Sequence, residues 1–271
     1  MRFAITYYKN NIAGKNIAVQ FKKLAFSPQI PIIELNKETI YSNDINEKKY
    51  PELKNIEFLV FASTHRSKEN KPALTVHAPG NWRSAELGGI QGKACISSAF
   101  ILKYLFKKLH ENVNKNQEIK NKYEITLEAT HHGPLINIPC CFIELGSTEN
   151  EWIDESAAKI LAETILSLEK FNKKEHEKWI PCFAIGGTHY CPNFNKIQLN
   201  SKYAISHIIP QYVFPITETI LKEAEQKTLE QVKEVLIDWK GCGKSEERLN
   251  LLNLLKKLGL SYKRTSDIEK M

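Results

Sequence analysis

Histidine follows five apolar runs of this 271-residue chain, and imidazole is the side chain best suited to proton transfer and metal binding near neutral pH. Neutral imidazoles together with a carboxylate can bind zinc, which lowers the pKa of a bound water to about 7. Without a metal, the same side chains can act as general bases or orient a nucleophilic water. The runs lead into His65, His77, the pair His131-His132, His189 and His207, whereas His110 and His176 lie elsewhere. This pattern predicts a hydrolytic site.

The segment Glu128–His132 carries the densest group of such side chains. If the strand before it continues, its period of two places Glu128, Thr130 and His132 on one face and His131 on the other. We therefore assign catalysis to Glu128 with His132, and His131 is the alternative member of the pair. Cys191 is a weaker metal candidate because its spacing from His189 matches no established zinc pattern. The expected metal ligands are His65, His77, His132 and His189.

Two glycine pairs are candidate substrate-binding turns. Gly88-Gly89 precedes Lys93 and an expected helix, and Gly186-Gly187 precedes His189. Backbone N–H groups in such turns can hold a phosphate or stabilise the oxyanion of an ester under attack. The first turn is not a nucleotide-binding P-loop, because its spacing is one residue short and Ala94 replaces Ser or Thr. Tight turns that only need positive φ would explain the same glycines.

The hydrophobic pattern predicts the scaffold that must position these residues. Strand-like runs cover 2–7, 16–21, 30–35, 56–62, 73–78, 123–129, 137–145, 179–185 and 203–209, and helical periodicity covers 92–110, 154–168, 218–236 and 246–258. This alternation predicts an α/β fold of three layers, with a largely parallel mixed sheet between helices on both faces. Ligands of such sheets bind beyond the carboxyl ends of the strands. We therefore expect six of the eight histidines to meet at that edge.

Length and composition set the outer bounds. Residues 1–271 can form a single catalytic α/β unit or two interleaved lobes, and the polar segments 42–54 and 111–122 are expected as surface loops. No apolar run approaches the eighteen residues of a membrane span, and no export signal opens the chain, so a cytoplasmic protein is expected. The six cysteines form no regular framework and are expected to be reduced.

The formal charge of +7 is unevenly distributed. Residues 1–40 carry six basic and two acidic groups, and residues 240–271 carry eight and four. Two basic ends suit a polyanion such as RNA, because neutralised phosphates release counterions. A soluble surface without such a partner would explain the same charge.

Several ordered motifs resemble the archaeal and plant type of D-aminoacyl-tRNA deacylase. They run over about residues 2–245: 63–67 (STHRS), 74–81 (LTVHAPGN), 86–89 (ELGG), 128–134 (EATHHGP), 143–149 (IELGSTE), 186–190 (GGTHY), 207–212 (HIIPQY) and 238–241 (DWKG). One such motif would be weak evidence, whereas the ordered set is specific. The resemblance implies hydrolysis of D-aminoacyl-tRNA to a free D-amino acid and tRNA as translation quality control. It further implies zinc as cofactor and a core resembling phosphorylase and peptidyl-tRNA hydrolase.

Other classes of protein share parts of this pattern. A metal-dependent amidohydrolase or peptidase would use the same histidines without an RNA surface. A non-catalytic RNA-binding protein would use the basic ends but has no need of the histidines. From the resemblance we expect aminoacylated tRNA as the partner, and we expect a monomer.

Overall fold

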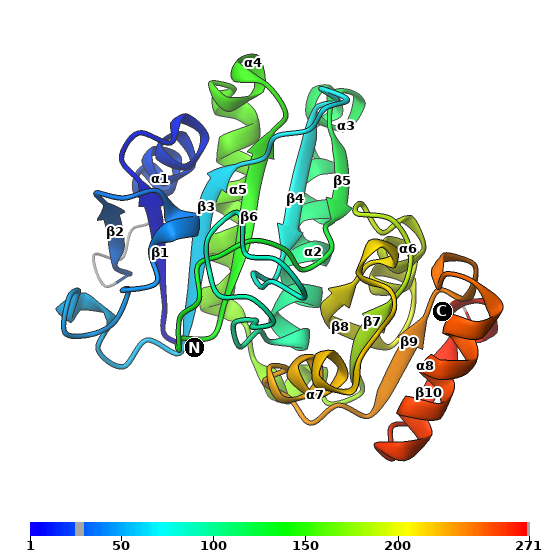
Figure 1. The fold of residues 1–271 in the computed structure, drawn as a ribbon. Coiled ribbons are helices and arrows are strands. Elements are labelled where there is room, and N and C mark those ends of the chain that lie inside the picture. Colours follow the sequence, from blue (N-terminus) through cyan, green and yellow to red (C-terminus); the bar gives the residue numbers. More distant parts are fainter. Residues whose placement is uncertain (25–29, 270–271) are drawn as a thin grey trace.

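The computed structural model describes residues 1–24 and 30–269, and it confirms an α/β fold. Ten strands form two separate sheets, shown side by side in Figure 1. The strands are β1 (Phe3–Tyr8), β2 (Ile32–Leu35), β3 (Phe58–Thr64), β4 (Ala73–His77), β5 (Glu124–Leu127), β6 (Cys140–Gly146), β7 (Ile180–Ile185), β8 (Tyr203–Ile209), β9 (Glu234–Ile237) and β10 (Tyr262–Arg264).

The helices lie between and after these strands. They are α1 (Ile12–Leu24), α2 (Ala99–Val113), α3 (Gln117–Lys122), α4 (Glu149–Trp152), α5 (Glu155–Leu166), α6 (Pro192–Asn200), α7 (Glu218–Gln226) and α8 (Ser245–Lys257). None of the helices in the described ranges is long and apolar enough to cross a membrane.

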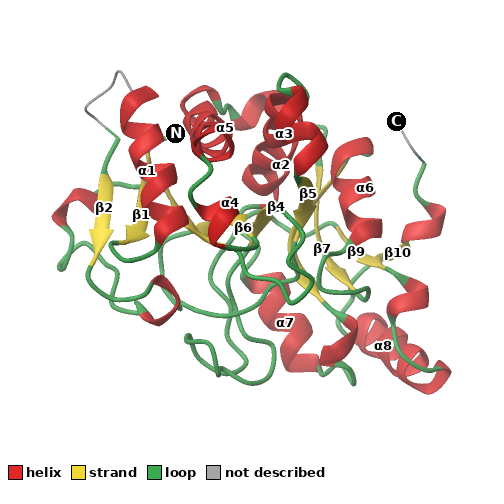
Figure 2. Cartoon of the chain, turned by 90° about the horizontal axis from the view of Figure 1, so that it is seen from above, coloured by secondary structure: helices red, strands yellow, loops and turns green. Residues whose placement is uncertain are grey.

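The six-stranded sheet is mixed and has the order β2-β1-β3-β6-β4-β5. Strands β1, β2, β3 and β6 pair in parallel, whereas β4 pairs antiparallel with β6 and parallel with β5. Helices α1, α2 and α5 pack on one face of the sheet, which carries Val60 and Ile143 in the main core. Figure 2 shows these helices together on one side and irregular loops on the other. The loop side buries Phe61 and Phe142 beneath residues such as Leu53.

The four-stranded sheet is entirely parallel and has the order β10-β9-β7-β8. Alternate residues of β7 face opposite sides, as the strand period requires. Cys182 and Ala184 belong to the core shared with α2 and α6, and Phe183 and Ile185 to the core under α7 and α8. The expected helices on both faces are thus present at this sheet, while α-helices cover one face of the six-stranded sheet within the described ranges.

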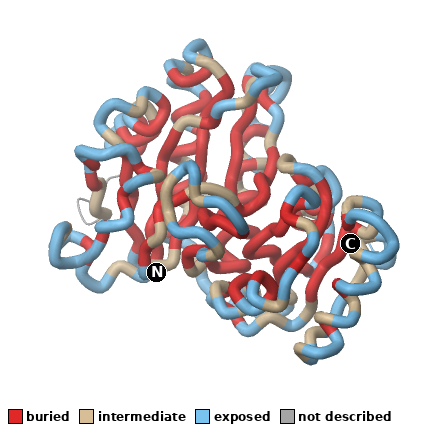
Figure 3. Tube along the Cα trace, viewed as in Figure 1, coloured by how far each residue is buried: buried red, intermediate tan, exposed pale blue. Residues whose placement is uncertain are grey.

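The two sheets are joined by a shared core and by the segment after β5. The Ala129 N–H donates to His189 O at 2.8 Å and the Thr130 N–H to Ile208 O at 3.0 Å. Helix α2 contacts strands of both sheets. Burial is therefore continuous across the junction, as Figure 3 shows by the buried trace running through both sheets.

One predicted element is of the wrong type, and two predicted helices have wrong bounds. Residues 16–21 belong to helix α1, because Ala13, Ile17 and Phe21 recur at helical spacing and are all buried. The predicted helix 92–110 begins only at Ala99, where Ser98 caps it. The predicted helix 218–236 ends at Gln226, and its last residues form strand β9 inside a buried parallel sheet.

Other elements lie outside the prediction. Helices α3 and α6 and strand β10 occupy stretches that were assigned to loops or left unassigned. The remaining predicted strands and the helices at 154–168 and 246–258 are confirmed within a few residues.

Candidate active site

Seven side chains from two strands, β4 and β6, and from the loops after β3, β5 and β7 meet at the loop-covered face of the six-stranded sheet. They are His65, His77, Glu128, His131, His132, Glu144 and His189. Three groups of them place one ligand atom per residue within 4.8 Å of one another: His77 with His131 and His132, Glu128 with His131 and His189, and His65 with Glu128 and Glu144.

Glu128 is the centre of the second and third groups and is almost completely buried. The His189 Nε2–H donates to Glu128 Oε2 at 2.9 Å, and His131 Nε2 lies 3.8 Å from the same oxygen. His65 Nδ1 lies 3.2 Å from the other oxygen, Oε1. One carboxylate therefore contacts three imidazoles.

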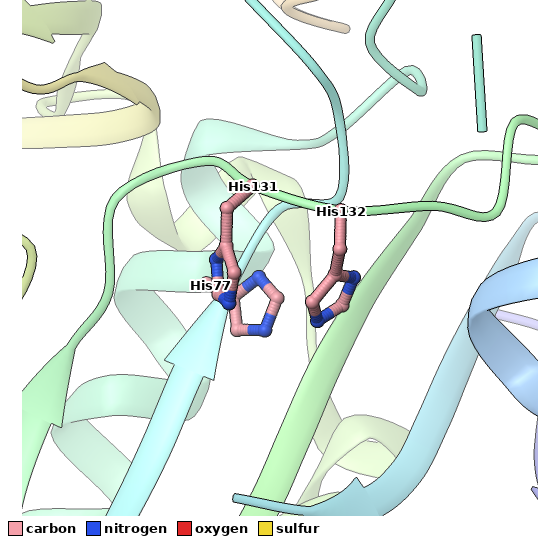
Figure 4. A group of neighbouring side chains, drawn as sticks. All are labelled: His77, His131 and His132. Carbon is pink, nitrogen blue, oxygen red and sulfur yellow. The ribbon is translucent and has the colours of Figure 1, made fainter. Parts of the chain in front are cut away.

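The remaining group consists of His77, His131 and His132, and their Nε2 atoms are available to a ligand. The Nδ1 atoms of His77, His131 and His132 lie 3.2, 2.8 and 2.6 Å from the carbonyl oxygens of Ala78, Ala129 and Gly133. A nitrogen this close to a carbonyl must carry the proton, so each neutral ring keeps its lone pair on Nε2. The three rings converge in Figure 4, His77 from the end of β4 and the other two from the loop above it.

The sheet brings these residues together in a way that the sequence argument did not foresee. Because β4 runs antiparallel to β6, the carboxyl ends of β3 and β4 point in opposite directions. The site therefore lies over the face of the sheet and not at one edge. Glu144 connects the group around Glu128 with the three-histidine group. Its Oε2 atom lies 3.9 Å from His65 Nδ1 and 3.7 Å from His77 Nε2.

The facing argument for the histidine pair was wrong. Strand β5 ends at Leu127, before the pair, and His132 has a positive φ of 44°. The period of two therefore no longer applies, and His131 and His132 both enter the cluster. Their ring centroids are 4.2 Å apart.

His207 does not join the cluster. It lies inside β8, fully buried, with Nδ1 at 3.2 Å from Thr130 Oγ1 and Nε2 at 3.1 Å from Lys227 O. Both ring nitrogens thus have partners within the fold, and burial lowers the pKa of His207 to about 4. It is a structural residue, so five of the eight histidines meet and not six.

Burial and neighbouring charge set the protonation of the cluster. Burial, followed by the charges of His132 and His77, lowers the pKa of His131 far below its usual value, and burial with His77 lowers that of His132 to about 3. Burial opposes ionisation of Glu128, but the contacts with His189 and His65 outweigh it and hold its pKa well below normal. Glu128 is thus an ionised carboxylate beside two neutral imidazoles.

The pKa values of His65 and His77 shift in the opposite direction, upward. Burial favours their neutral forms, yet the carboxylates of Glu128 and Glu144 beside His65, and of Glu144 beside His77, raise their pKa values.

The cluster opens into two clefts. A cleft of 670 Å³ is lined by all the site residues except the buried His77, and by Tyr8, Asn11, Arg66, Leu87 and Trp152. A smaller one of 280 Å³ runs along Asn81, Trp82 and Tyr212. His131 and His132 line both clefts and so form the wall between them.

Contacts within the fold hold both glycine turns in place. The N–H groups of Gly186 and Gly187 donate to Ile209 O and Gly241 O, so neither is available to an oxyanion. A Cβ on Gly88 would lie 1.9 Å from Ile40 O, which shows that this glycine permits a close approach of two loops. Lys93 lies 3.2 Å from Glu223, away from the cluster.

Hydrogen bonds within the fold also occupy two other candidate binding groups, the N-terminus of α2 and the thiol of Cys191. The N-terminus of α2 is buried and already occupied, because Glu230 accepts hydrogen bonds from Ser98 Oγ and the Ala99 N–H. Cys191 Sγ donates to the carbonyls of Thr188 and His189 and belongs to none of the candidate metal groups in the described residues.

Sequence reasoning missed Glu144 and Tyr212 as site residues. A charged residue inside the apolar run 140–145 was the available signal for Glu144, because a buried carboxylate needs a compensating partner. Tyr212 places Oη at 3.2 Å from His189 Nδ1 and had no comparable signal in the sequence.

The donor set fits a zinc ion. His77 Nε2 is a buried side-chain nitrogen without a hydrogen-bond partner, and such an atom is costly unless a ligand satisfies it. Three imidazoles whose other nitrogen donates to a backbone carbonyl have the arrangement that orients histidine toward a metal. Nitrogen and carboxylate donors in this number suit zinc.

The fold and the cluster define an α/β protein with a site lined by histidines and carboxylates. A sequence model of the D-aminoacyl-tRNA deacylase family matches residues 52–263. The D-aminoacyl-tRNA deacylase of Thermococcus onnurineus is 38% identical over 85% of this chain and 82% of its own length. That of Methanocaldococcus jannaschii is 29% identical over 97% and 100%. The chain belongs to the D-aminoacyl-tRNA deacylase family.

A solved structure supports the fold independently. The crystal structure described as a conserved protein of unknown function, AF0625, is 26% identical, superimposes with a TM-score of 0.86 and covers 98% of each chain. The family resemblance and the prediction that the chain is an enzyme are confirmed.

Proposed function

We propose that this protein hydrolyses the ester bond between a D-amino acid and the 3′ end of tRNA, with a zinc ion held by His77, His131 and His132. The convergence of three Nε2 atoms beside the ionised Glu128, in a chain of this family, carries the proposal. This ligand set keeps His77 and His132 from the sequence prediction and replaces His65 and His189 by His131.

The roles follow from the contacts. When bound, a zinc ion supplies Lewis acidity, polarising an ester carbonyl and lowering the pKa of water. Glu128, ionised and within reach of the cleft, accepts the proton of the attacking water. His189 shares Glu128 Oε2 and can donate a proton to the departing ribose oxygen as the C–O bond breaks. The products are a free carboxylic acid and a tRNA hydroxyl.

Two other residues hold this pair in place. His65 lies 3.2 Å from the second oxygen of Glu128 and so fixes the orientation of the carboxylate. The Tyr212 hydroxyl donates to His189 Nδ1 and keeps the Nε2–H directed at Glu128. The whole cluster comes from one chain, which supports activity as a monomer, and aminoacyl-tRNA as substrate implies the cytoplasm as its place.

Deacylation of D- and L-tyrosyl-tRNA at equal concentrations tests the function. The D-ester should be hydrolysed about a thousandfold faster, because a transition-state difference of roughly 4 kcal/mol suffices and a misdirected α-ammonium can supply it. Both esters incubated without protein give the background. Equal rates for the two enantiomers would exclude the proposed function.

A further inference from the structure

Another cleft, separate from those at the histidine cluster, lies at the carboxyl end of the four-stranded sheet. It has a volume of 510 Å³ and runs between helix α6, the ends of β9 and β10, and residues 265–269. The neighbouring strands β7 and β9 continue into helices on opposite faces, α6 with the main core and α8 with the second core. Adjacent strands of this kind flank a topological switch point, where parallel sheets bind ligands.

Basic side chains and an indole line this groove. Lys196 comes from α6, Lys240 follows β9 and Arg264 ends β10. Within the described ranges none of the three has an acidic partner within 4.0 Å, although Asp238 and Glu269 also line the groove. Asp238 is buried and accepts a hydrogen bond from Asn193 at 2.9 Å. The cations thus remain available to a ligand.

Two guanidinium groups lie over the indole of Trp239. Arg264 is 3.9 Å from the ring centroid and Arg248 is 5.3 Å from it. Stacking of this kind fixes the planar cations without neutralising them, so their N–H groups stay free for phosphate. A groove lined by unpaired cations suits the phosphate backbone of a nucleic acid.

We propose that this groove holds the phosphodiester backbone of the tRNA arm next to the aminoacylated 3′ end. The inference rests on the proposed function for the identity of the RNA. One loop connects the two sites, because Asn193 in the groove follows His189 in the cluster by four residues. Their Cα atoms are therefore at most about 14 Å apart. The groove therefore lies within reach of a nucleic-acid strand whose ester is among the histidines.

Filter binding of deacylated tRNA across a salt series tests the groove. The triple variant Lys196→Gln, Lys240→Gln, Arg264→Gln should bind at least tenfold more weakly, and its log–log salt slope should fall by about 2 to 3, because each phosphate contact contributes about 0.9. Lys196→Gln alone should reduce the slope by about 1. The turnover number at saturating D-tyrosyl-tRNA should stay within twofold of the wild type, since these residues do not touch the ester.

The matched control removes equal charge from exposed positions outside the groove: Lys54→Gln, Lys120→Gln, Lys173→Gln. It should keep more of the tRNA affinity and salt slope than the groove variant. Equal losses in both variants, or wild-type affinity in the groove variant, would overturn the inference. Deacylation without D-preference contradicts the proposed function and leaves the binding result standing. D-selective deacylation with undiminished binding in the groove variant contradicts the groove alone.

Discussion

At the residue scale, the side chains of the cluster differ in which atoms remain available to a ligand. His77, His131 and His132 each give Nδ1 to a backbone carbonyl and keep Nε2 free. His65 and His189 instead contact Glu128. The same residue type therefore serves two roles, as candidate ligand and as partner of the catalytic carboxylate.

Replacing His132 by Ala should reduce turnover at least a hundredfold, roughly 3 kcal/mol, because the cluster loses one of three converging donors. His176→Ala should leave turnover near the wild-type value, since His176 stacks on Trp179 outside the cluster with ring centroids 4.0 Å apart. Single-turnover deacylation of D-tyrosyl-tRNA measures both. Near-normal activity of the His132 variant would remove this residue from the mechanism.

Removal of metal should abolish activity, and zinc should restore it. The purified protein is expected to hold zinc, and chelation should also lower its melting temperature, because a ligand that binds only the folded state stabilises it. Metal analysis and calorimetry before and after chelation provide readouts apart from activity. Full turnover in protein shown to be metal-free would contradict zinc dependence and leave base catalysis by histidine.

At the element scale, helix α2 is attached to its surroundings by a buried lysine. The ammonium of Lys103 is fully buried and donates to the carbonyls of Gln198, Ser201 and Tyr203. These carbonyls belong to the end of α6 and the start of β8. One side chain therefore ties α2 to the sheet that carries His189.

Lys103→Met should lower the free energy of unfolding by about 3 kcal/mol, because three buried carbonyls lose their shared donor. Lys107→Met, half-buried on the same helix, should change it by less than about 0.5 kcal/mol. Urea denaturation followed by circular dichroism measures the difference. Equal stability of the two variants would show that the carbonyls find other partners.

At the scale of the whole molecule, the site depends on how the two sheets meet. Glu128 and the histidine pair follow β5 of the first sheet, whereas His189 follows β7 of the second. Thr130 lies at the junction, where its Oγ1 accepts from the Ile208 N–H at 3.1 Å. A shift of one sheet against the other would therefore separate Glu128 from His189.

The two sheets should unfold together, because they share one hydrophobic core. Urea transitions followed by tryptophan fluorescence and by circular dichroism should coincide. Thr130→Val should lower the free energy of unfolding by about 1 to 2 kcal/mol, since it leaves a buried N–H with one acceptor fewer. Thr219→Val, exposed on α7, is the control. Two separate transitions in the wild-type protein would indicate independent lobes.

The sequence by itself determined the fold class, the family and most members of the site. Buried strands such as 58–62 are apolar on both faces, and this pattern indicates a buried strand whatever the order of strands in the sheet. The histidines after these runs were correctly singled out because polar side chains at the end of a buried strand need partners or a function. Ordered motifs over most of the chain identified the family without any geometry.

Only the tertiary structure decided which of those side chains meet and how. The direction of β4 is set by pairing with a distant strand, so the local pattern could not show that the site lies over a sheet face. The turn at His132 breaks the strand period, and β8 encloses His207, through contacts made far along the chain. Strand β9 has a helix-like local pattern and becomes a strand because β7 and β10 offer it hydrogen bonds on both sides. Long-range pairing, which local spacing does not encode, placed the residues that the sequence had named.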